Sequence, residues 1–389
     1  RVLFRSIPYS RQLIDTKDIK SVIKTLKSDF LTQGKNLLKF ENKISNKFQS
    51  KYSICFNSAT SALHISCLAL GVTKGDIVWT CTNSFVASSN CALYCGATVD
   101  LVDMDERNFN INISELEKKL ILAKKKNKLP KLVIPVHFAG LPCDMKKIHS
   151  LSIKYKFKIL EDASHAVGAK YYNEKIGNCK YSDIAVFSFH PVKIITTAEG
   201  GAALTNNKNL KDKLALYRNH GITREKKYLE NKNFPKWYYE HIGLGYNYRL
   251  NEIQSALGIV QLSKLEKWIK YRQKIFLNYA EGLKNLPIIL PLNYKNYKSS
   301  NHLYIIQLLD KSGNLRNKLY NYLKSSMIEA NVHYIPIHTH PYYRKLGFQK
   351  KNFPNANLYY KRCLSLPMYA GLKQSQQQEV IKKINKFFK

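Results

Sequence analysis

A lysine in the middle of the chain has the residue type and the position that carbonyl chemistry requires. Lys193 directly follows the segment 188–192 (SFHPV), which we expect to leave the end of a strand, where α/β folds bind their ligands. An amine must be neutral to form an imine, and because an unperturbed lysine has a pKa of about 10.4, burial or a neighbouring cation has to lower it. The apolar neighbours Ile194 and Ile195 supply part of such burial. On its own, the pattern also fits an ordinary solvated lysine.

Two acidic residues, Glu161 and Asp162, follow another apolar run in the segment 160–165 (LEDASH). A carboxylate at the end of a buried strand is costly unless a cation or hydrogen bonds compensate it. The protonated ring nitrogen of pyridoxal phosphate is such a cation, and an aspartate beside it keeps the ring able to accept electrons. The spacing fits equally well an Asp162 that caps the next helix.

Small hydroxylated residues follow the strand expected over 53–57, in the segment 57–61 (NSATS). A helix that begins there has free backbone N–H groups and a positive dipole end, both of which favour a bound phosphate. An ordinary Ser or Thr N-cap explains the same residues at least as well.

A late loop, 333–344 (HYIPIHTHPYYR), gathers histidines and aromatic residues. Its His338 and His340 form a His-x-His pair, but no carboxylate or cysteine set stands nearby, so we expect no metal there. Such a loop suits a sugar or nucleotide surface better, with His338, Tyr342 and Arg344 as candidates.

The eight cysteines are scattered through apolar segments and are typical of reduced thiols. Cys91 and Cys95 lie four residues apart in a helix-like segment without a second cysteine or histidine pair nearby. Because two cysteines alone are too few ligands for a zinc site, we expect no zinc here.

Apolar, β-rich runs alternate with segments of helical periodicity, which is typical of an α/β fold with a largely parallel sheet. A length of 389 residues exceeds what one ordinary core supports, so we predict a large domain over 1–260 and a small C-terminal domain over 261–389. Strands are expected over 53–57, 76–82, 98–103, 131–138, 158–162, 183–189, 201–205 and 303–309, and helices over 61–70, 86–94, 114–125, 145–155, 253–279 and 316–330.

The composition limits the kinds of partner. A formal charge of +36 suits nucleic acid, anionic lipid or phosphorylated ligands. The basic residues are spread thinly along the chain, however, which favours anionic small molecules over a nucleic-acid surface. The sequence has no apolar stretch of about eighteen residues, as a membrane span requires, and residues 1–10 lack a secretory signal. We therefore expect a cytoplasmic protein that binds neither nucleic acid nor membrane.

Taken together and in this order, the segments resemble the DegT/DnrJ-type sugar aminotransferases. The resemblance runs from about residue 7 to residue 368, and its most specific parts are 161–165, 188–201 and 245–258. It implies the aspartate-aminotransferase-like fold type I of pyridoxal-phosphate-dependent transferases, with a large mixed, mostly parallel sheet domain and a smaller C-terminal α+β domain. It also implies a transaminase with pyridoxal 5′-phosphate as cofactor, working as a homodimer with active sites shared across the interface.

The resemblance gives a role to each matching residue. Lys193 is the lysine that holds the cofactor and then moves the proton, Asp162 faces the pyridine nitrogen, and His165 lies near the ring and its hydroxyl. Many relatives have glycine where this chain has Ser58 or Ala59. The phosphate contact therefore requires a turn whose backbone conformation these two residues can adopt. The other implied cofactor contacts are the phosphate turn at Ala59 and Thr60, the phosphate ligand Ser188, the ring-stacking Phe85, and Asn247 from the neighbouring subunit.

Within the family, the strings 57–64 (NSATSALH), 188–193 (SFHPVK) and 196–201 (TTAEGG) look most like the branch that acts in pseudaminic acid biosynthesis. The implied reaction moves an amino group from glutamate to C4 of a UDP-linked 2-acetamido-2,6-dideoxy-4-keto-hexose. Its product is UDP-4-amino-4,6-dideoxy-N-acetyl-β-L-altrosamine. Arg249 joins His338, Tyr342 and Arg344 as a candidate for binding this nucleotide sugar.

Other functions fit parts of the same pattern. An aminoarabinose-type or C3-specific nucleotide-sugar aminotransferase keeps the chemistry and changes the sugar. A cofactor-dependent sugar dehydratase of the family would carry a histidine in place of Lys193. A DNA-binding regulator built on an aminotransferase-like domain would need a helix-turn-helix module, for which we find no spare segment.

Overall fold

The computed structural model describes residues 6–389 except 231–232 and 295, and its largest element is a seven-stranded sheet in the order β1-β9-β8-β5-β4-β2-β3. β9 pairs antiparallel with both of its neighbours, whereas the other neighbouring pairs are parallel. The prediction of a large, mixed, mostly parallel sheet is confirmed. The strands are β1 (Tyr52–Phe56), β2 (Ile77–Cys81), β3 (Thr98–Val102), β4 (Leu132–Ile134), β5 (Lys158–Asp162), β8 (Ile184–Ser188) and β9 (Gly201–Thr205).

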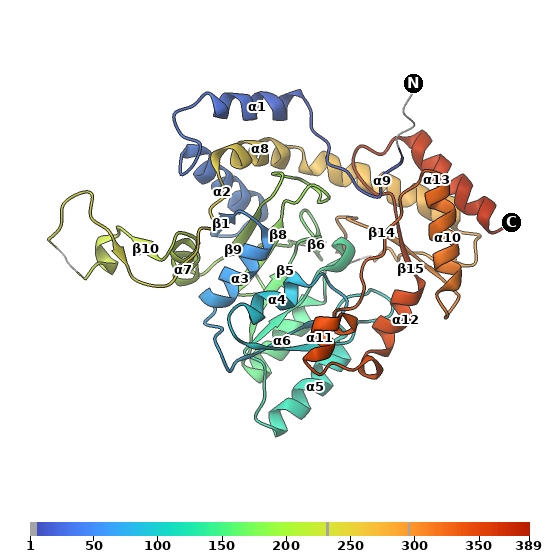
Figure 1. The fold of residues 1–389 in the computed structure, drawn as a ribbon, viewed down its shortest axis with the longest axis horizontal. Helices are drawn as coiled ribbons and strands as arrows, with labels where there is room; N and C mark the ends of the chain where they lie inside the picture. Colours follow the sequence, from blue (N-terminus) through green and yellow to red (C-terminus); the bar gives the residue numbers. More distant parts are fainter. Residues whose placement is uncertain (1–5, 231–232, 295) are drawn as a thin grey trace.

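Alternate residues along the strands enter two separate cores, because successive side chains of a strand point to opposite faces. In β8, Ile184 and Val186 join one core, whereas Ala185 and Phe187 join the other. The first core lies beneath α3 (Ala59–Ala69), α4 (Ala87–Leu93) and α7 (Lys208–Arg218). The second lies beneath α2 (Lys35–Phe48), α5 (Ile113–Lys125), α6 (Met145–Tyr155) and α8 (Glu252–Ser263). Helices thus cover both faces of the sheet (Figure 1).

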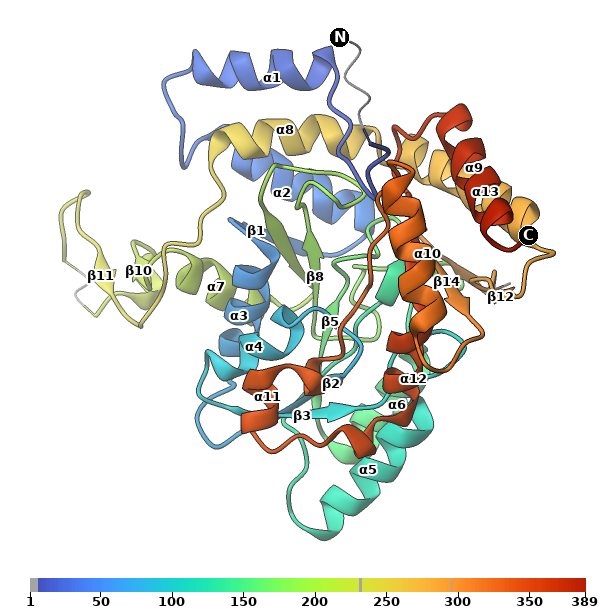
Figure 2. The same ribbon diagram turned by 45° about the vertical axis from the view of Figure 1, so that its right-hand side comes forward.

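The C-terminal part builds a smaller antiparallel sheet with β14 (Tyr304–Leu308) between β12 (Ile288–Ile289) and β15 (Cys363–Leu366). Three helices, α9 (Leu265–Leu283), α10 (Asn314–Ser325) and α13 (Gln374–Phe387), form a third core with it (Figure 2). Tyr343 in α11 (Pro341–Lys345) and Tyr359 in α12 (Pro354–Arg362) belong instead to the core of the large sheet. The domain boundary near residue 260 stays a prediction.

The N-terminal segment lies against the C-terminal part before it reaches the large sheet. Ile7 forms a parallel bridge with Ile328, and the Tyr9 carbonyl accepts a hydrogen bond from the Met368 N–H (2.9 Å). The chain then enters α1 (Thr16–Leu26), which packs on α8. A further small sheet consists of β13 (Tyr297–Lys298), β6 (Lys170–Tyr171) and β7 (Glu174–Lys175).

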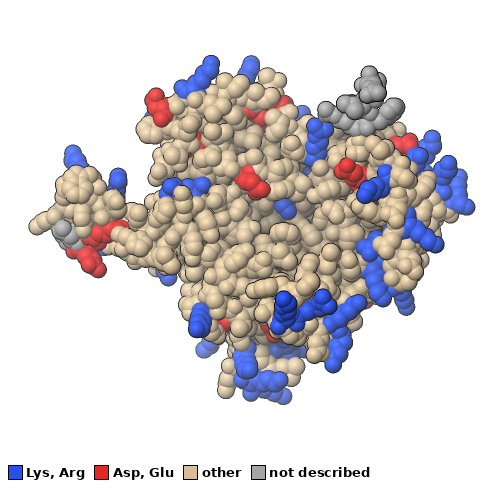
Figure 3. All heavy atoms as spheres, viewed as in Figure 1, with Lys and Arg blue, Asp and Glu red and all other residues tan. Residues whose placement is uncertain are grey.

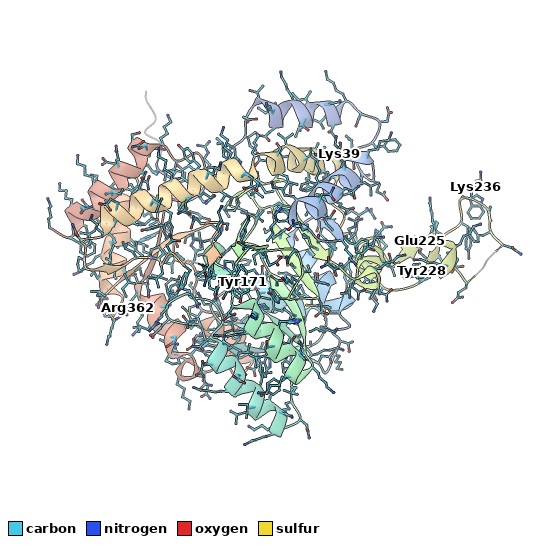
Figure 4. The ribbon with its side chains drawn as sticks, turned by 180° about the vertical axis from the view of Figure 1, so that it is seen from behind. Lys39, Tyr171, Glu225, Tyr228, Lys236 and Arg362 are labelled. Atoms are coloured by element: carbon cyan, nitrogen blue, oxygen red, sulfur yellow. The ribbon has the colours of Figure 1, made fainter. Side chains whose placement is uncertain are left out.

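A projecting arm leaves the body between α7 and α8 (Figures 1 and 2). It contains the short hairpin of β10 (Ile222–Thr223) and β11 (Glu240–His241), and Figure 4 shows Glu225, Tyr228 and Lys236 on it, away from the body of the chain. Trp237 and Leu244 are 72% and 77% exposed there. Large apolar side chains exposed on an extension are typical of a protein-interaction surface.

Two helices differ from their expected form. The helix expected over 253–279 is two helices, since Lys264 ends α8 and α9 begins directly after it. The helix expected over 316–330 is α10 and ends at Ser325, because Met327 takes a φ of 60° and turns the chain. No helix in the described part of the chain is long and apolar enough to cross a membrane. Lys and Arg side chains lie scattered over the face seen in Figure 3.

Candidate active site

The ends of neighbouring strands bring the predicted site residues to one edge of the large sheet. Asp162 ends β5 and Ser188 ends the adjacent β8. Gly201, which starts the antiparallel β9, pairs with Ser188 on one side and with Phe56, the end of β1, on the other. A Cβ at Gly201 would stand 2.6 Å from Ala59 Cα. The missing side chain therefore lets β9 meet the start of α3 at the same edge.

Lys193 lies half-buried in the loop that connects β8 to β9. Its N–H donates to the His190 carbonyl (2.9 Å), and Ser10 Oγ donates to the Val192 carbonyl (3.0 Å), so the loop is held from two sides. Burial lowers the pKa of Lys193 to about 8, although the negative charge of Asp162 acts in the opposite direction. At pH 7 about a tenth of the amine is then unprotonated, far more than in a free lysine.

Asp162 is 5% exposed and accepts hydrogen bonds on both carboxylate oxygens, from Ser88 Oγ (2.6 Å) and from the Ser164 N–H (3.1 Å). The residues that follow, 163–168, form turns and no helix. The interpretation of Asp162 as a helix N-cap is therefore wrong; the Ser164 bond is the local turn that an Asp side chain forms with the backbone two residues on. Both hydrogen-bond donors are neutral, so neither of them pairs with the carboxylate as a cationic ligand would.

His165 is buried and held in one orientation. Its Nδ1 accepts a hydrogen bond from the Ala139 N–H (3.3 Å), which leaves Nε2 to carry the ring proton toward Tyr334 Oη (3.1 Å). Burial lowers the pKa of His165 well below its usual range, and the charge of Lys193 acts in the same direction. The ring is therefore neutral, and the predicted place of His165 near the cofactor ring and its hydroxyl stays a prediction.

The N-terminus of α3 offers backbone donors at this edge. Ser58 Oγ accepts from the Ser61 N–H (3.0 Å), and the Ala62 N–H donates to the Ser58 carbonyl (3.1 Å). The amides of Ala59 and Thr60 precede these bonds and therefore point out of the helix end. Ser58 has a φ of −156° and Ala59 already belongs to the helix, so the turn needs no glycine. The N-cap interpretation holds for Ser58 and leaves the phosphate site open.

Phe85 is largely exposed to solvent and contacts Tyr334. Its side chain is 57% exposed, and its ring centroid is 6.0 Å from that of Tyr334, the residue that contacts His165. Ser188 is buried at the end of β8, and its Oγ lies 3.5 Å from the His190 N–H as a weak acceptor.

Asn247 and Arg249 lie at the base of the arm, where it passes the end of β1. Backbone bridges join Asn247 to Asn219 and Arg249 to Phe56, and the Arg249 guanidinium also donates to the Asn219 side chain. The Asn247 side chain is exposed. The structure thus brings this segment beside the edge that holds the site; a contact of Asn247 with a neighbouring subunit stays a prediction.

His338 has a packing role instead of the predicted substrate contact. The buried ring is hydrogen-bonded at Nδ1 to Thr82 Oγ1 (2.7 Å) and at Nε2 to Asn357 Oδ1 (3.1 Å), and it stacks on Phe353 at 4.3 Å. Both nitrogens are engaged within the chain because the loop 337–339 packs on the end of β2. A substrate therefore finds no free nitrogen on this ring.

Tyr342 and Arg344 are exposed on α11. The buried Tyr343 between them fastens this helix to α4, where its hydroxyl donates to Asn90 Oδ1 (2.6 Å). The position leaves both neighbours open to solvent, and their contact with a substrate stays a prediction.

Four residues of the site had no role in the sequence analysis: Ser88, His302, His333 and Tyr334. Ser88 stands three residues after Phe85 in the same segment, and Tyr334 and His333 belong to the late loop, but nothing in their spacing points to Asp162 or His165. Burial lowers the pKa of His302 and of His333, and the Lys193 charge contributes in both. Neutral imidazoles therefore surround the amine.

Pyridoxal phosphate fits the chemistry of these groups. An amine of lowered pKa at Lys193 suits its aldehyde, a buried carboxylate with only neutral donors at Asp162 suits its ring nitrogen, and helix amides at Ala59 and Thr60 suit its phosphate. The residues present would therefore hold this cofactor at the edge of the large sheet.

Known proteins resemble the chain over nearly its whole length. A sequence model described as the DegT/DnrJ/EryC1/StrS aminotransferase family matches residues 12–385. A Campylobacter jejuni protein named UDP-4-amino-4,6-dideoxy-N-acetyl-beta-L-altrosamine transaminase is 38% identical over 364 residues, which covers 93% of this chain and 92% of that protein.

Solved structures share the fold. Helicobacter pylori PseC, described as an aminotransferase involved in the biosynthesis of pseudoaminic acid, superimposes with a TM-score of 0.91 and 34% identity over 99% of each chain. The PLP form of the putative sugar aminotransferase Spr1654 from Streptococcus pneumoniae superimposes with a TM-score of 0.89 and 27% identity over 98% of each chain. The prediction of fold type I is confirmed.

Proposed function

Since the chain belongs to the DegT/DnrJ/EryC1/StrS aminotransferase family, and is thereby a pyridoxal-phosphate-dependent sugar aminotransferase, we propose its specific reaction. It moves an amino group from glutamate to C4 of a UDP-linked 2-acetamido-2,6-dideoxy-4-keto-hexose and makes UDP-4-amino-4,6-dideoxy-N-acetyl-β-L-altrosamine. The observation that carries this proposal is the nearly full-length match to the Campylobacter jejuni transaminase named for that compound.

In this proposal Lys193 Nζ is the group that takes up and returns the proton in both halves of the reaction. Its pKa of about 8 places both protonation states within reach near neutral pH, as a general acid and base requires. Asp162 places its carboxylate against the ring nitrogen, and His165 stays neutral in the orientation set by Ala139 and Tyr334. The cofactor, when bound, supplies the carbon that carries the amino group and a ring that accepts electrons.

We further propose that the working form is a cytoplasmic homodimer, in which the arm of each copy lies against the other. The exposed Trp237 and Leu244 provide an apolar surface for such a contact, and the exposed Asn247 at the base of the arm would reach the cofactor phosphate of the neighbouring copy. Sedimentation of wild type and of Trp237→Ser should then show a dimer and a weakened dimer; a wild-type monomer that is fully active contradicts the shared site.

The amino-transfer step can be tested in two halves. Cofactor-saturated protein is mixed with glutamate alone, and the visible absorption of the bound cofactor is followed; the keto-sugar is then added and its amino product is identified by mass spectrometry. Lys193→Ala should lose both changes. Lys208→Ala, at an exposed lysine of α7, is the matched control and should retain them. A glutamate response with no amino product contradicts the sugar assignment and leaves the transaminase intact.

A second candidate is amination of a different nucleotide sugar. The observation in its favour is that the putative sugar aminotransferase Spr1654 shares almost the whole fold, so that the fold leaves the choice of sugar open. Competition between 4-keto and 3-keto sugars linked to different nucleotides gives ratios of kcat/KM, and the preferred sugar decides between the candidates.

A further inference from the structure

A cavity of about 680 Å³ lies between loops of the large sheet, α9 and the segment that leads into β14. Lys193, Asp162 and Ser188 do not line it, so it is separate from the place of the cofactor. A cavity that binds a small molecule usually measures about 300–1,000 Å³, and this one has room for such a ligand. The wall comes from the segments 107–109, 138–141, 170–173, 273–276, 291–294 and 296–305.

The charged residues of this cavity are all basic. Arg107, Lys170 and Lys298 line it, and the described lining residues include no Asp or Glu. None of the three cations forms an ion pair within the part of the chain that the structure describes. Cations without acidic partners favour an anionic ligand, and Arg and Lys are the side chains that bind phosphate groups.

Tyrosine rings form a second part of the wall. Tyr297 has its ring centroid 5.8 Å from that of Tyr294 and 5.9 Å from that of Tyr172, and all three residues line the cavity. Tyr297 also stacks on the buried Tyr171 at 5.2 Å, which lies near the middle of the view in Figure 4, away from the arm. Because Tyr172 is 51% exposed, its ring is open to a planar group that stacks on it.

Side-chain amides supply the remaining polar groups. The Asn301 amide N–H donates to the Gln273 carbonyl oxygen (2.7 Å), and both residues line the cavity. Asn and Gln carry a donor and an acceptor side by side, which is the pattern that the edge of a nucleobase bonds. Four more asparagines line the cavity: Asn108, Asn173, Asn293 and Asn296.

We propose that this cavity is a second ligand site and that it binds a nucleotide. The base stacks on the tyrosines and bonds to the amides, and the phosphate groups meet Arg107, Lys170 and Lys298. An inorganic anion would use the cations and leave the tyrosines without a role, whereas a neutral sugar would leave the cations without one. A nucleotide uses both. The proposal holds whichever sugar the enzyme aminates.

The wall of the cavity also supports His165. Ala139 lines the cavity; its N–H donates to His165 Nδ1 (3.3 Å), and its carbonyl accepts from the His302 N–H (3.0 Å). Ser300, next to the lining residue Asn301, donates from Oγ to the His165 carbonyl (2.6 Å). A nucleotide in the cavity therefore contacts the backbone segments that hold His165, so the second site is coupled to the cofactor site.

The first experiment locates the nucleotide in the wild-type holoenzyme and needs no variant. Protein saturated with pyridoxal phosphate is irradiated with 8-azido-ADP or, separately, with 5-azido-UDP, and the labelled peptides are identified by mass spectrometry. We expect at least one probe to label 170–173 or 291–305, and the better probe identifies the preferred base. Label from both probes that is absent from these segments overturns the proposal.

The second experiment reverses the charge of the wall. The Kd of the nucleotide that labels the cavity is measured by calorimetry for the wild type and for Arg107→Glu/Lys170→Glu. The double variant should bind about tenfold more weakly or worse, because it loses two charge-assisted contacts. Lys124→Glu/Lys125→Glu, at exposed lysines of α5, makes the same charge change elsewhere and should keep the wild-type Kd.

Two results of this experiment overturn the proposal. One is an equal Kd for the wild type and both double variants. The other is a KM for the nucleotide-sugar substrate that rises in step with the Kd, because the cavity would then be the nucleotide subsite of the substrate and no second site.

The coupling to His165 is tested with the same nucleotide. Cofactor-free protein is titrated with pyridoxal phosphate in the presence and absence of the nucleotide, and we expect the affinity to change by about fivefold or more. Arg107→Glu/Lys170→Glu should lose this change, whereas direct competition at the cofactor phosphate would persist in the double variant. Equal cofactor affinity with and without the nucleotide overturns the coupling.

Discussion

Ser88 Oγ donates a hydrogen bond of 2.6 Å to the Asp162 carboxylate, across the contact between α4 and the end of β5. Ser84 Oγ lies 2.7 Å from the same hydroxyl, so a second serine orients the donor. The acid is thus positioned by neutral groups alone. A cationic hydrogen-bond donor in this place would have paired with the carboxylate that the cofactor ring requires.

Ser88→Ala should weaken the binding of pyridoxal phosphate about ten- to a hundredfold. A hydrogen bond to a charged group contributes about 1.5–3 kcal/mol, and its loss leaves Asp162 less well placed. Affinity is measured by titrating the cofactor-free variant and following visible absorption. The control is Ser89→Ala on the same helix, whose hydroxyl bonds to the Val86 carbonyl (3.0 Å) and to Tyr343 Oη, and so tests the loss of a buried serine hydroxyl of α4 that does not bond to Asp162. Equal affinity of Ser88→Ala and wild type would contradict the role given to this bond.

The attachment of the cofactor to Lys193 should become faster with rising pH, with a midpoint near pH 8. The reason is that only the neutral amine reacts, and burial lowers the pKa of Lys193 to about 8. Borohydride reduction followed by mass spectrometry measures the attached fraction with time. Asp162→Asn should move the midpoint to lower pH, since the Asp162 charge acts to raise this pKa. A wild-type midpoint near 10.4, the value of a free lysine, is the contrary result.

Lys193→Met should stabilise the cofactor-free protein at pH 7. The pKa of Lys193 is lower in the folded chain than in the unfolded chain, so the unfolded chain binds more protons between about pH 8 and pH 10.4. Wild-type stability therefore rises with pH through this window, and the gain from the substitution is largest below pH 8 and shrinks above it. Melting temperatures from pH 6 to pH 10 check this; a gain independent of pH would mean that packing alone is responsible.

Gly201→Ala should lower both the melting temperature and the cofactor affinity. Its Cβ would meet the Ala59 backbone N and Cα at 2.6 Å, and backbone atoms at the start of a helix cannot swing aside as a flexible side chain does. Overpacking of this kind costs about 1–3 kcal/mol. The control is Gly243→Ala, whose nearest neighbour, Tyr217 Cε1, is 3.6 Å away. Equal melting temperatures of the two variants would contradict the close contact between β9 and the start of α3.

The sequence pointed to the part of the site that lies within single segments. Lys193 and Asp162 follow apolar strands, and because parallel strands carry their ligands at one edge, their meeting there was predictable. The cap at Ser58 was predictable for the same local reason. The large sheet followed from the alternation of apolar and helical runs.

The sequence could not predict the features of the site that depend on contacts between distant segments. Ser88 reaches Asp162 only because α4 packs on the end of β5. Both ring nitrogens of His338 are engaged by Asn357 and by Thr82, and Thr82 lies far from His338 along the chain. The break between α8 and α9 at Lys264 could not be predicted either, because the apolar residues keep their helical spacing on both sides of it.

The bridge between Ile7 and Ile328, and the hydrogen bond from Met368 to the Tyr9 carbonyl, have a consequence for synthesis on the ribosome. The partners of this N-terminal segment emerge only when nearly the whole chain has been made. The segment that is translated early must therefore wait in an undocked form while the large sheet assembles, and it takes its place last. In a growing chain the Val192 carbonyl, next to the reactive lysine, would receive its Ser10 contact only at that closing stage.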